Sequence, residues 1–294
     1  MATFSNWITG ARVRTLPLAA APVILGSASA DLVDKFNPLL GLGALLVALF
    51  LQIGVNYAND YSDGVRGTDD NRVGPLRLTA SGLARPQSVK LAAFVTFGIA
   101  GLIGLAMVIA TAQWWLLVVG AFAILAAWYY TGGKTPYGYA GLGEVAVFVF
   151  FGLVATVGTN FLMTLTIDPL SVILGSASGL YASAVLLVNN IRDLETDRAS
   201  GKKTIAVRLG DKRSRVLFLV LIYLPVALNV LMVLIYPAVV IGLLNLLLLV
   251  PISGIALSGK TPKELITALK LTSLAGFFYG LLVGLGLFLV SFSL

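Results

Sequence analysis

The sequence predicts an all-α integral membrane protein, a bundle of nine transmembrane helices. Hydrophobic residues make up 58% of the chain, charged residues only 11%, and the mean hydropathy is +0.95. Ordinary soluble domains carry about a quarter charged residues. The apolar residues gather in runs long enough to cross a bilayer, which takes roughly 20 residues per helix. Strands that alternate with a period of two are missing from the sequence, so a membrane barrel is not expected.

Nine apolar runs define the expected spans in chain order. They cover residues 15–31, 38–59, 89–110, 114–131, 141–162, 169–190, 216–235, 237–257 and 271–292. Two long loops follow the second and sixth runs, at about 60–88 and 191–215. The whole chain, 1–294, is therefore expected to form a single transmembrane domain with these two loops as a cap.

The distribution of Lys and Arg predicts the orientation, because positively charged loops stay on the cytoplasmic side. With the N-terminus inside, the inner segments contain 19 of the 20 basic residues, and only Lys35 lies outside. An odd number of spans is needed for this split, so the C-terminus is expected outside. The net charge of +7 follows from the same rule and does not indicate nucleic-acid binding.

The first run has an alternative interpretation as a cleavable signal peptide. Arg12 and Arg14 precede it, and the small residues 26–30 resemble a cleavage site. Pro17 and Pro22 are unusual in the apolar part of such a peptide, and its removal would leave eight spans. A first transmembrane helix is therefore favoured.

One polar pattern occurs twice, at the inner ends of the second and sixth spans. On a helix with about 100° per residue, the first copy falls within about 100° and the second within about 80° of arc. A single such cluster could be interfacial aspartates paired with arginines, but two copies at matching positions indicate a shared functional site. The first copy consists of Asn56, Asn59, Asp60 and Asp63; the second, 133 residues later, consists of Asn189, Asp193 and Asp197.

The residue types present restrict the chemistry of this site. The chain has no Cys, which excludes disulfides and thiolate chemistry, and no His, which removes the usual proton shuttle. A site built from oxygen atoms suits a hard cation, and Mg²⁺ typically binds through one or two carboxylates plus substrate phosphates. The Arg and Lys residues of the two loops are suited to bind phosphate oxygens. The sequence thus predicts two facing stripes that hold a polyphosphate with Mg²⁺.

Two glycine patterns are assigned to structure. Residues 254–261 match the phosphate-binding loop G-x-x-x-x-G-K-[ST], but that loop needs a preceding strand and a following helix in an α/β domain. Here an apolar run precedes it and Pro262 follows, so a helix end is expected and no nucleotide site. Gly280, Gly284 and Gly286 in the last run are expected to be positions of close helix packing.

The two aspartate patterns resemble the paired motifs of the UbiA-type intramembrane aromatic prenyltransferases, over essentially the whole chain. Several stretches are similar to one branch, the 1,4-dihydroxy-2-naphthoate polyprenyltransferases of menaquinone biosynthesis. They are Arg14-Thr-Leu-Pro17, Asn59-Asp60-Tyr-Ser-Asp63-Gly-Val-Arg-Gly67-Thr-Asp69, Arg72-Val-Gly-Pro-Leu-Arg77 and Tyr130-Thr-Gly-Gly-Lys134-Thr-Pro136-Tyr137-Gly-Tyr139. The wider family often has a third acidic residue where this chain has Gly67; Asp69 lies two residues beyond that position and is not counted among the expected metal ligands.

The resemblance implies a central cavity that faces the cytoplasm in the bacterial cytoplasmic membrane. There a polyprenyl diphosphate would ionise, and its allylic cation would be attacked by 1,4-dihydroxy-2-naphthoate with loss of CO₂ and diphosphate, giving demethylmenaquinol. The expected Mg²⁺ ligands are Asp60, Asp63, Asp193 and Asp197, with Asn56 and Asn189 orienting ligands or substrate. The expected diphosphate contacts are Arg66, Arg77, Lys134, Arg192, Lys202, Asn59 and Tyr130. Tyr137 and Tyr139 are expected either to line the aromatic pocket or to lie as interfacial tyrosines.

Other activities fit parts of the pattern. A 4-hydroxybenzoate prenyltransferase would share the metal site but keep the carboxylate of its acceptor. A phosphatidyl-group transferase would place its aspartates within a single segment of about two dozen residues, whereas here they are 133 residues apart. A cation-coupled transporter would need polar groups near the bilayer midplane, whereas these stripes lie at the inner surface.

Overall fold

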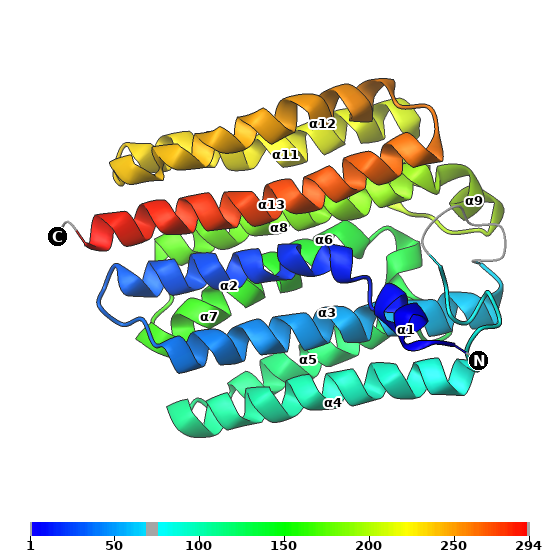
Figure 1. Ribbon diagram of the computed structural model, residues 1–294, viewed down its shortest axis with the longest axis horizontal. Helices are drawn as coiled ribbons and strands as arrows, with labels where there is room; N and C mark the ends of the chain where they lie inside the picture. The colour runs from blue at the N-terminus through cyan, green and yellow to red at the C-terminus, as the bar shows by residue number, and fades with distance from the viewer. Residues whose placement is uncertain (1, 69–75, 293–294) are drawn as a thin grey trace.

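The computed structural model describes residues 2–68 and 76–292, and within these ranges nine helical segments run side by side along the molecule (Figure 1). Seven are long and apolar enough to cross a membrane, and two shorter segments, α2 and α5, are also apolar. The predicted nine-helix bundle is confirmed. The segments are α2 (Leu16–Asp31), α3 (Pro38–Arg66), α4 (Pro86–Thr111), α5 (Leu116–Tyr129), α6–η3–α7 (Gly143–Val147, Phe148–Val154, Ala155–Thr164), α8 (Pro169–Arg192), α11 (Asp211–Val233), η4–α12 (Pro237–Asn245, Leu246–Ser258) and α13 (Pro262–Ser291).

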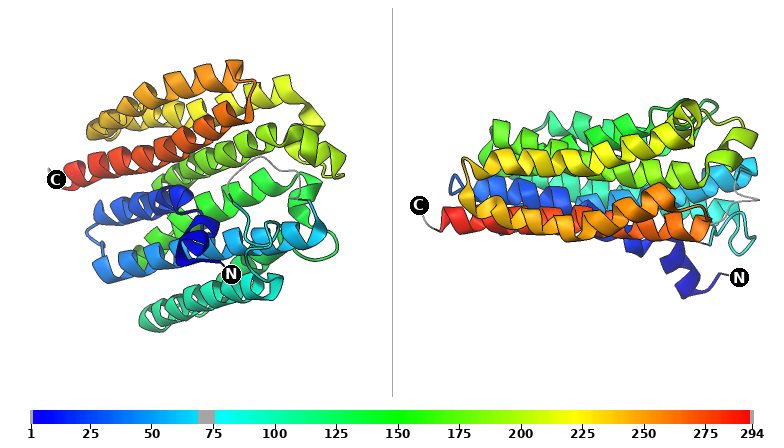
Figure 2. Two further views of the ribbon diagram at one scale, coloured as in Figure 1. Left: turned by 45° about the vertical axis from the view of Figure 1, so that its right-hand side comes forward. Right: turned by 90° about the horizontal axis from the view of Figure 1, so that it is seen from above.

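Short helices gather at one end of the bundle, where they form a cap. The N-terminus also lies at this end, whereas the C-terminus lies at the opposite end, as an odd number of crossings requires (Figure 1). Helix α1 stands out from the bundle beside the cap (Figure 2). The short elements are α1 (Phe4–Gly10), η1 (Val13–Thr15), η2 (Tyr137–Ala140), α9 (Leu194–Ala199) and α10 (Ile205–Leu209).

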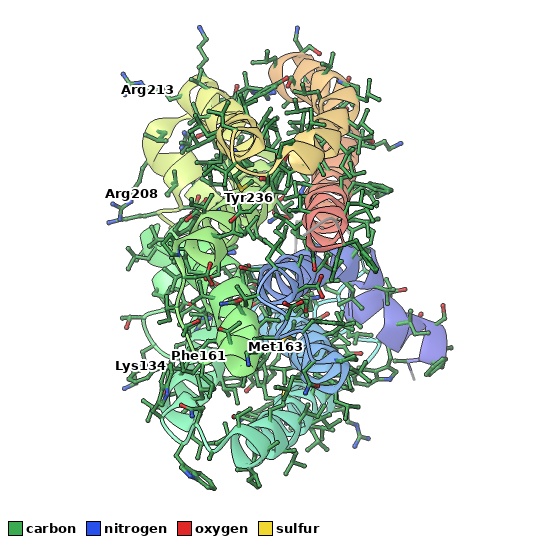
Figure 3. All side chains as sticks on the ribbon, turned by 90° about the vertical axis from the view of Figure 1, so that its left-hand side faces the viewer. Lys134, Phe161, Met163, Arg208, Arg213 and Tyr236 are labelled. Atoms are coloured by element: carbon green, nitrogen blue, oxygen red, sulfur yellow. The ribbon has the colours of Figure 1, made fainter. Side chains whose placement is uncertain are left out.

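The helices form an elongated bundle when they are seen from the end (Figure 3). On one side α13 packs on α2, and α2 packs on α3; on the other side α8 packs on η3. Helices α11 and α12 cover one end of this elongated bundle through α8 and α13, and α4 covers the other end through α3 and α5. Many outward-facing side chains are apolar, such as Leu102 at 69% and Leu247 at 74% exposure, which suits a lipid environment.

Two helix ends differ from the expected ones because of local signals. The second span was expected to end at residue 59, but α3 continues to Arg66, so that the whole aspartate stripe is helical. It ends at Gly67, whose φ of 72° suits glycine. Helix α13 begins at Pro262 and not near 271, because Thr261 and Glu264 form a capping box.

Both structural assignments of the glycine patterns are confirmed. Helix α12 ends at Ser258, and the residues that match the phosphate-binding loop form a helix end without a preceding strand. In α13, a Cβ atom added at Gly280 would lie 2.7 Å from Ala21 Cβ, and one at Gly286 would lie 2.7 Å from Ala238 O. These glycines therefore allow the close approach of α2 and η4.

The π-helical segment η3 lies against α8 at similarly close range. A Cβ atom added at Gly152 would lie 2.4 Å from Gly179 Cα, so the two backbones touch. The bundle interior around α8, α11, α12 and α13 is solidly packed, with Tyr181, Phe218 and Tyr279 fully buried. A large cavity lies in the other half of the molecule.

Candidate active site

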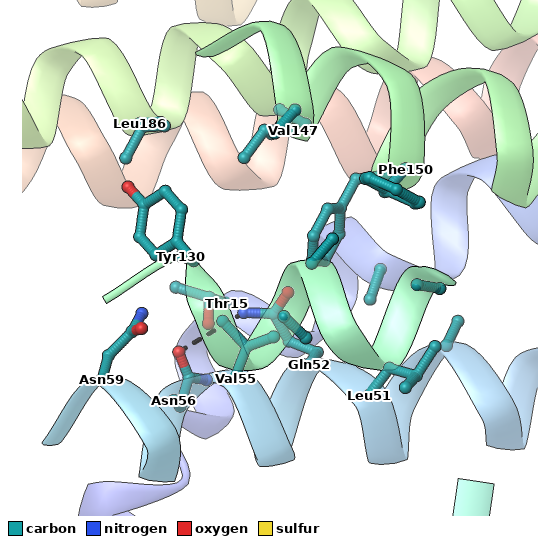
Figure 4. Close-up of a pocket in the computed structure, with 18 of the residues that line it drawn as sticks. Thr15, Leu51, Gln52, Val55, Asn56, Asn59, Tyr130, Val147, Phe150 and Leu186 are labelled. Carbon is teal, nitrogen blue, oxygen red and sulfur yellow. Dashed lines mark hydrogen bonds between the residues drawn. The ribbon is translucent and has the colours of Figure 1, made fainter. Parts of the chain in front are cut away.

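A cavity of about 1100 Å³ lies among α2, α3, α4, α5, α6–α7 and α8 and reaches the cap. Its length is lined by apolar residues such as Leu51, Val55 and Phe150, and asparagine side chains approach it from α3 (Figure 4). At the cap end the lining becomes acidic, amidic and basic. The cavity therefore joins an apolar channel to a polar pocket.

The first polar pattern reaches this pocket from α3. Asn56, Asn59 and Asp63 line the cavity and are buried. The Asn56 amide donates to the carbonyl oxygen of Ala11 at 2.9 Å, and the Asn59 side-chain oxygen accepts a hydrogen bond from the Thr131 hydroxyl at 2.8 Å. Both amides are thus fixed by the segments that flank the helix.

Asp63 is the carboxylate of α3 that faces the cavity. The Tyr139 hydroxyl donates to its Oδ1 at 2.5 Å, and Arg77 Nη2 lies 4.0 Å from its Oδ2. Asp63 and Arg77 are both buried and both line the cavity. The carboxylate therefore has one neutral donor and one cation as neighbours in the same pocket.

The second polar pattern reaches the pocket from the end of α8. Asn189, Asp193 and Asp197 line the cavity, and both carboxylates are buried. The Arg192 guanidinium donates to both oxygens of Asp193, at 2.7 and 2.6 Å, and Lys202 Nζ lies 3.5 Å from Asp197 Oδ1. The two patterns, far apart in sequence, thus line a single pocket.

Tyr139 links the two halves of this pocket. Two cations lie near its ring: the Arg66 guanidinium is 5.5 Å from the ring centroid, and Lys202 Nζ is 4.6 Å from the same centroid. Its backbone oxygen accepts a hydrogen bond from the Lys203 amide at 2.8 Å. Burial and the neighbouring Asp63 carboxylate raise the pKa of the Tyr139 hydroxyl, so this group remains a proton donor in the physiological range. Tyr139 therefore contacts Asp63 directly and is linked to Asp197 through Lys202.

Asp60 does not line the cavity, although it belongs to the same helical stripe. Its two carboxylate oxygens accept hydrogen bonds from the backbone amides of Leu78 and Thr79, at 2.7 and 2.8 Å, and its side chain is buried. On a helix it stands about 100° from Asn59 and about 60° from Asp63, at the edge of the stripe. In this structure Asp60 holds the loop that carries Arg77.

Two other predicted residues, Arg66 and Lys134, do not line the cavity, and a third cannot be placed. The Arg66 guanidinium donates to the backbone oxygens of Thr131 and Gly133. Lys134 is exposed and points outward at the rim of the molecule (Figure 3). Asp69 lies outside the described residues.

The predicted tyrosines of the α5–α6 connection lie at the cavity. Tyr130 and Tyr137 both line it, with ring centroids 5.6 Å apart in an edge-on arrangement. The Tyr137 hydroxyl donates to the Ala126 oxygen at 2.7 Å, and burial raises its pKa to about 12. Tyr137 therefore keeps its proton and helps to close the pocket next to α5.

Sequence reasoning missed several polar residues of the lining. Asn190 lies beside Asn189 but outside the predicted stripe, and Arg12 and Lys270 were given no role in the site. All three line the cavity. Their only signal was their position at inner span ends, which many residues without a site role share.

The polar pocket offers donor atoms that fit Mg²⁺. The carboxylates of Asp63, Asp193 and Asp197 and the amide oxygens beside them are hard oxygen ligands. Within residues 2–68 and 76–292, no three acidic side chains come close enough to form a metal site by themselves. An ion in this pocket would therefore need oxygen atoms from a bound phosphate as well, as is usual for Mg²⁺.

Comparisons with known proteins agree with this arrangement. Residues 19–274 match the model of the UbiA prenyltransferase family. The chain is 47% identical over 283 residues to the 1,4-dihydroxy-2-naphthoate octaprenyltransferase of Mycobacterium tuberculosis, which covers 96% of this chain and 97% of that protein. It is 42% identical over 215 residues to the Escherichia coli protein of the same name, covering 71% of this chain and 70% of that protein.

Solved structures show the same fold at low sequence identity. The apo structure of a UbiA homolog from Aeropyrum pernix K1 is similar over all of both chains, with a TM-score of 0.70 and 15% identity. The structure of a UbiA homolog from Archaeoglobus fulgidus bound to GPP and Mg²⁺ has a TM-score of 0.64 and 13% identity, over 95% of this chain and 99% of that chain.

Proposed function

The chain belongs to the UbiA prenyltransferase family, and from this premise we propose that it prenylates 1,4-dihydroxy-2-naphthoate. It transfers a polyprenyl group from polyprenyl diphosphate to the naphthoate ring, with loss of CO₂ and diphosphate, and so gives demethylmenaquinol for menaquinone biosynthesis. The observation that carries this assignment is 47% identity to a relative of that activity across 96% of the chain. The cavity supports it, because a polar pocket continues into an apolar channel.

The polar pocket binds the diphosphate head. Arg77, Arg192 and Lys202 line the cavity and supply the positive charge, and guanidinium groups are well suited to two-point contacts with phosphate. Asp63, Asp193 and Asp197 are the proposed Mg²⁺ ligands, with Asn59 as an additional oxygen donor. Bound Mg²⁺ would neutralise charge that develops on the departing diphosphate. Asn56 and Asn189 orient the groups around it.

The apolar channel holds the polyprenyl tail and excludes water. When the bond between the allylic carbon and the diphosphate oxygen breaks, both bonding electrons leave with the diphosphate. The resulting allylic cation is protected from hydrolysis because its surroundings are apolar side chains. The ring carbon of the acceptor then forms the new C–C bond, and the carboxylate on that carbon leaves as CO₂, which restores aromaticity.

The proposal extends to the cofactor, the membrane and the chain as a whole. The Archaeoglobus fulgidus homolog was solved with Mg²⁺ and GPP, which supports the same cofactor and a prenyl diphosphate as donor here. The protein is a multi-pass membrane protein. We propose the bacterial cytoplasmic membrane, with the N-terminus and the polar pocket on the cytoplasmic side and the C-terminus outside, because the basic residues concentrate at that end. Residues 1–294 form one domain.

The test is a reconstituted reaction with purified protein, a polyprenyl diphosphate and Mg²⁺. One series contains 1,4-dihydroxy-2-naphthoate and a parallel series contains 4-hydroxybenzoate, and mass spectrometry identifies the products. A prenylated naphthol that has lost its carboxylate is expected in the first series. A product that retains its carboxylate, or turnover of 4-hydroxybenzoate alone, would refute the naphthoate assignment.

A further inference from the structure

Glu144, at the start of α6, is a buried carboxylate outside the two aspartate patterns. Its side chain is only 6% exposed, and within the described part of the chain it belongs to no ion pair. A charged group in the membrane-embedded part of a protein is costly, so such groups commonly belong to functional sites. Glu144 has no role in the proposed prenyl transfer, so the burial of its carboxyl group requires another explanation.

Two hydrogen bonds from one face of α8 hold Glu144. The Asn190 amide nitrogen donates to its Oε1 at 2.9 Å, and the Ser183 hydroxyl donates to its backbone oxygen at 2.9 Å. Ser183 and Asn190 are seven residues apart, which places them on the same face of the helix. The serine therefore fixes the backbone of Glu144, and the carboxylate binds the amide.

This contact determines which end of the Asn190 amide faces the cavity. The NH₂ group of the amide donates to the Glu144 carboxyl oxygen, so this end of the amide points towards Glu144. Asn190 also lines the cavity. Its carbonyl oxygen is the end of the amide that remains for the cavity, and the hydrogen bond that the NH₂ group donates to Glu144 polarises the amide and makes that oxygen a stronger acceptor.

Tyr130, an aromatic residue of the cavity lining, lies next to the start of α6, where Glu144 is located. A Cβ atom added at Gly143, the residue before Glu144, would lie 3.3 Å from the Tyr130 hydroxyl oxygen and 3.2 Å from the Tyr130 ring. Tyr130 lines the cavity together with Tyr137. A flat aromatic molecule beside these rings would thus have a hydrogen-bond acceptor within the same pocket.

We propose that the Asn190 carbonyl oxygen accepts a hydrogen bond from a ring hydroxyl of the aromatic acceptor and that Glu144 is its positioning residue. This rests on the proposed function and names the part of the pocket that recognises the acceptor. The hydrogen bond orients the ring and increases electron density on the hydroxyl oxygen, which makes the ring a better nucleophile. Glu144 acts through the amide and does not itself contact the substrate.

The experiment measures KM for both substrates with the purified full-length protein. Glu144→Gln keeps the side-chain volume, but the Gln side chain can donate a hydrogen bond to the Asn190 oxygen. The Asn190 amide can then rotate by about 180°, so that its carbonyl oxygen no longer faces the cavity. KM for 1,4-dihydroxy-2-naphthoate should rise about tenfold, the effect of one lost hydrogen bond, while KM for the polyprenyl diphosphate stays within about twofold. Glu144→Asp keeps an acceptor-only group and should restore part of the affinity.

Two further variants separate this role from a structural one. Ser176→Ala removes a side-chain hydrogen bond to the backbone of the same helix α8, away from Glu144 and from the cavity lining, and it should leave both KM values unchanged. Asn190→Ser removes the amide and leaves the carboxylate, and it should again raise KM for the acceptor alone. The wild-type protein should also prefer 1,4-dihydroxy-2-naphthoate to an analogue lacking one ring hydroxyl, and Glu144→Gln should reduce this preference.

The outcomes distinguish the two proposals. If the wild-type protein does not prenylate the naphthoate, the proposed function is wrong. If it does, but Glu144→Gln and Asn190→Ser leave KM for the acceptor unchanged or raise both KM values equally, the role of the Glu144–Asn190 pair is wrong.

Discussion

Replacing Asp60 by Asn tests whether this aspartate binds metal or holds the loop that carries Arg77. The sequence predicts that Asp60 and Asp63 bind Mg²⁺ together. In the structure only Asp63 lines the cavity, whereas both oxygens of Asp60 accept hydrogen bonds from the backbone amides of Leu78 and Thr79. A metal ligand would mainly affect the Mg²⁺ concentration needed for activity, whereas a residue that holds the loop would mainly affect KM for the polyprenyl diphosphate.

The size of the effect follows from these two hydrogen bonds. Each backbone amide that donates to an ionised carboxylate contributes about 1.5–3 kcal/mol. Asn keeps one acceptor oxygen and places its NH₂ group against the other backbone amide, so about one such bond is lost. At 1.4 kcal/mol for each factor of ten, KM for the polyprenyl diphosphate should rise about tenfold to a hundredfold, because the adjacent Arg77 is no longer held in place.

The assay is turnover of a labelled polyprenyl diphosphate at a series of Mg²⁺ concentrations. For Asp60→Asn, the Mg²⁺ concentration that gives half-maximal rate should stay within about twofold of the wild-type value, because no ligand has been removed. For Asp63→Asn, the same concentration should rise by about tenfold or more. If Asp60→Asn shifts the Mg²⁺ requirement as strongly as Asp63→Asn does, Asp60 is a metal ligand and the loop argument is refuted.

Three further outcomes are expected from the same site. EDTA should stop turnover and excess Mg²⁺ should restore it; full activity in EDTA would contradict a hard-metal site. Tyr139→Phe should lower kcat/KM about tenfold, because the hydrogen bond to Asp63 is lost. The pKa of Tyr139 is raised, so ionisation of this tyrosine should cause no loss of wild-type activity below about pH 10. Gly120 lines the cavity about 15 Å from Tyr130 along α5, and there is open space beside its Cα. Gly120→Leu should therefore narrow the channel at that depth. Turnover of long polyprenyl diphosphates should fall, whereas turnover of geranyl diphosphate should continue. Gly98→Leu, on the exposed face of α4 with similar open space, is the control, and an equal loss with both donors would argue against a tail channel there.

Much of the fold could be predicted because the local composition of the sequence is enough to identify a membrane span. A run of about 20 apolar residues has few alternatives to a transmembrane helix, and all nine expected runs are helical in the structure. The shifted ends depended on signals only a few residues long, such as the capping box at Thr261. The pairing of distant helices, as of α13 with α2, depends on close contacts such as that of Gly280 with Ala21, whose partners the sequence does not reveal.

The candidate site could be predicted only in part because helical periodicity gives the angles between residues but not the direction of the cavity. Asn59, Asp60 and Asp63 share one arc of α3, yet the cavity faces only part of that arc, and Asp60 faces the loop. For Arg66 the sequence shows a cation near the site but not the backbone oxygens that it binds.

The sequence by itself determined the membrane class, the nine spans, the two polar patterns and, through the missing His and Cys, the restriction to oxygen-based chemistry. Only the tertiary structure decided which side chains meet. It placed Tyr139 between the two patterns and Glu144 behind the amide of Asn190. The physical reason is that composition and periodicity act along one helix, whereas a site is formed by the packing of several helices and the loops that join them.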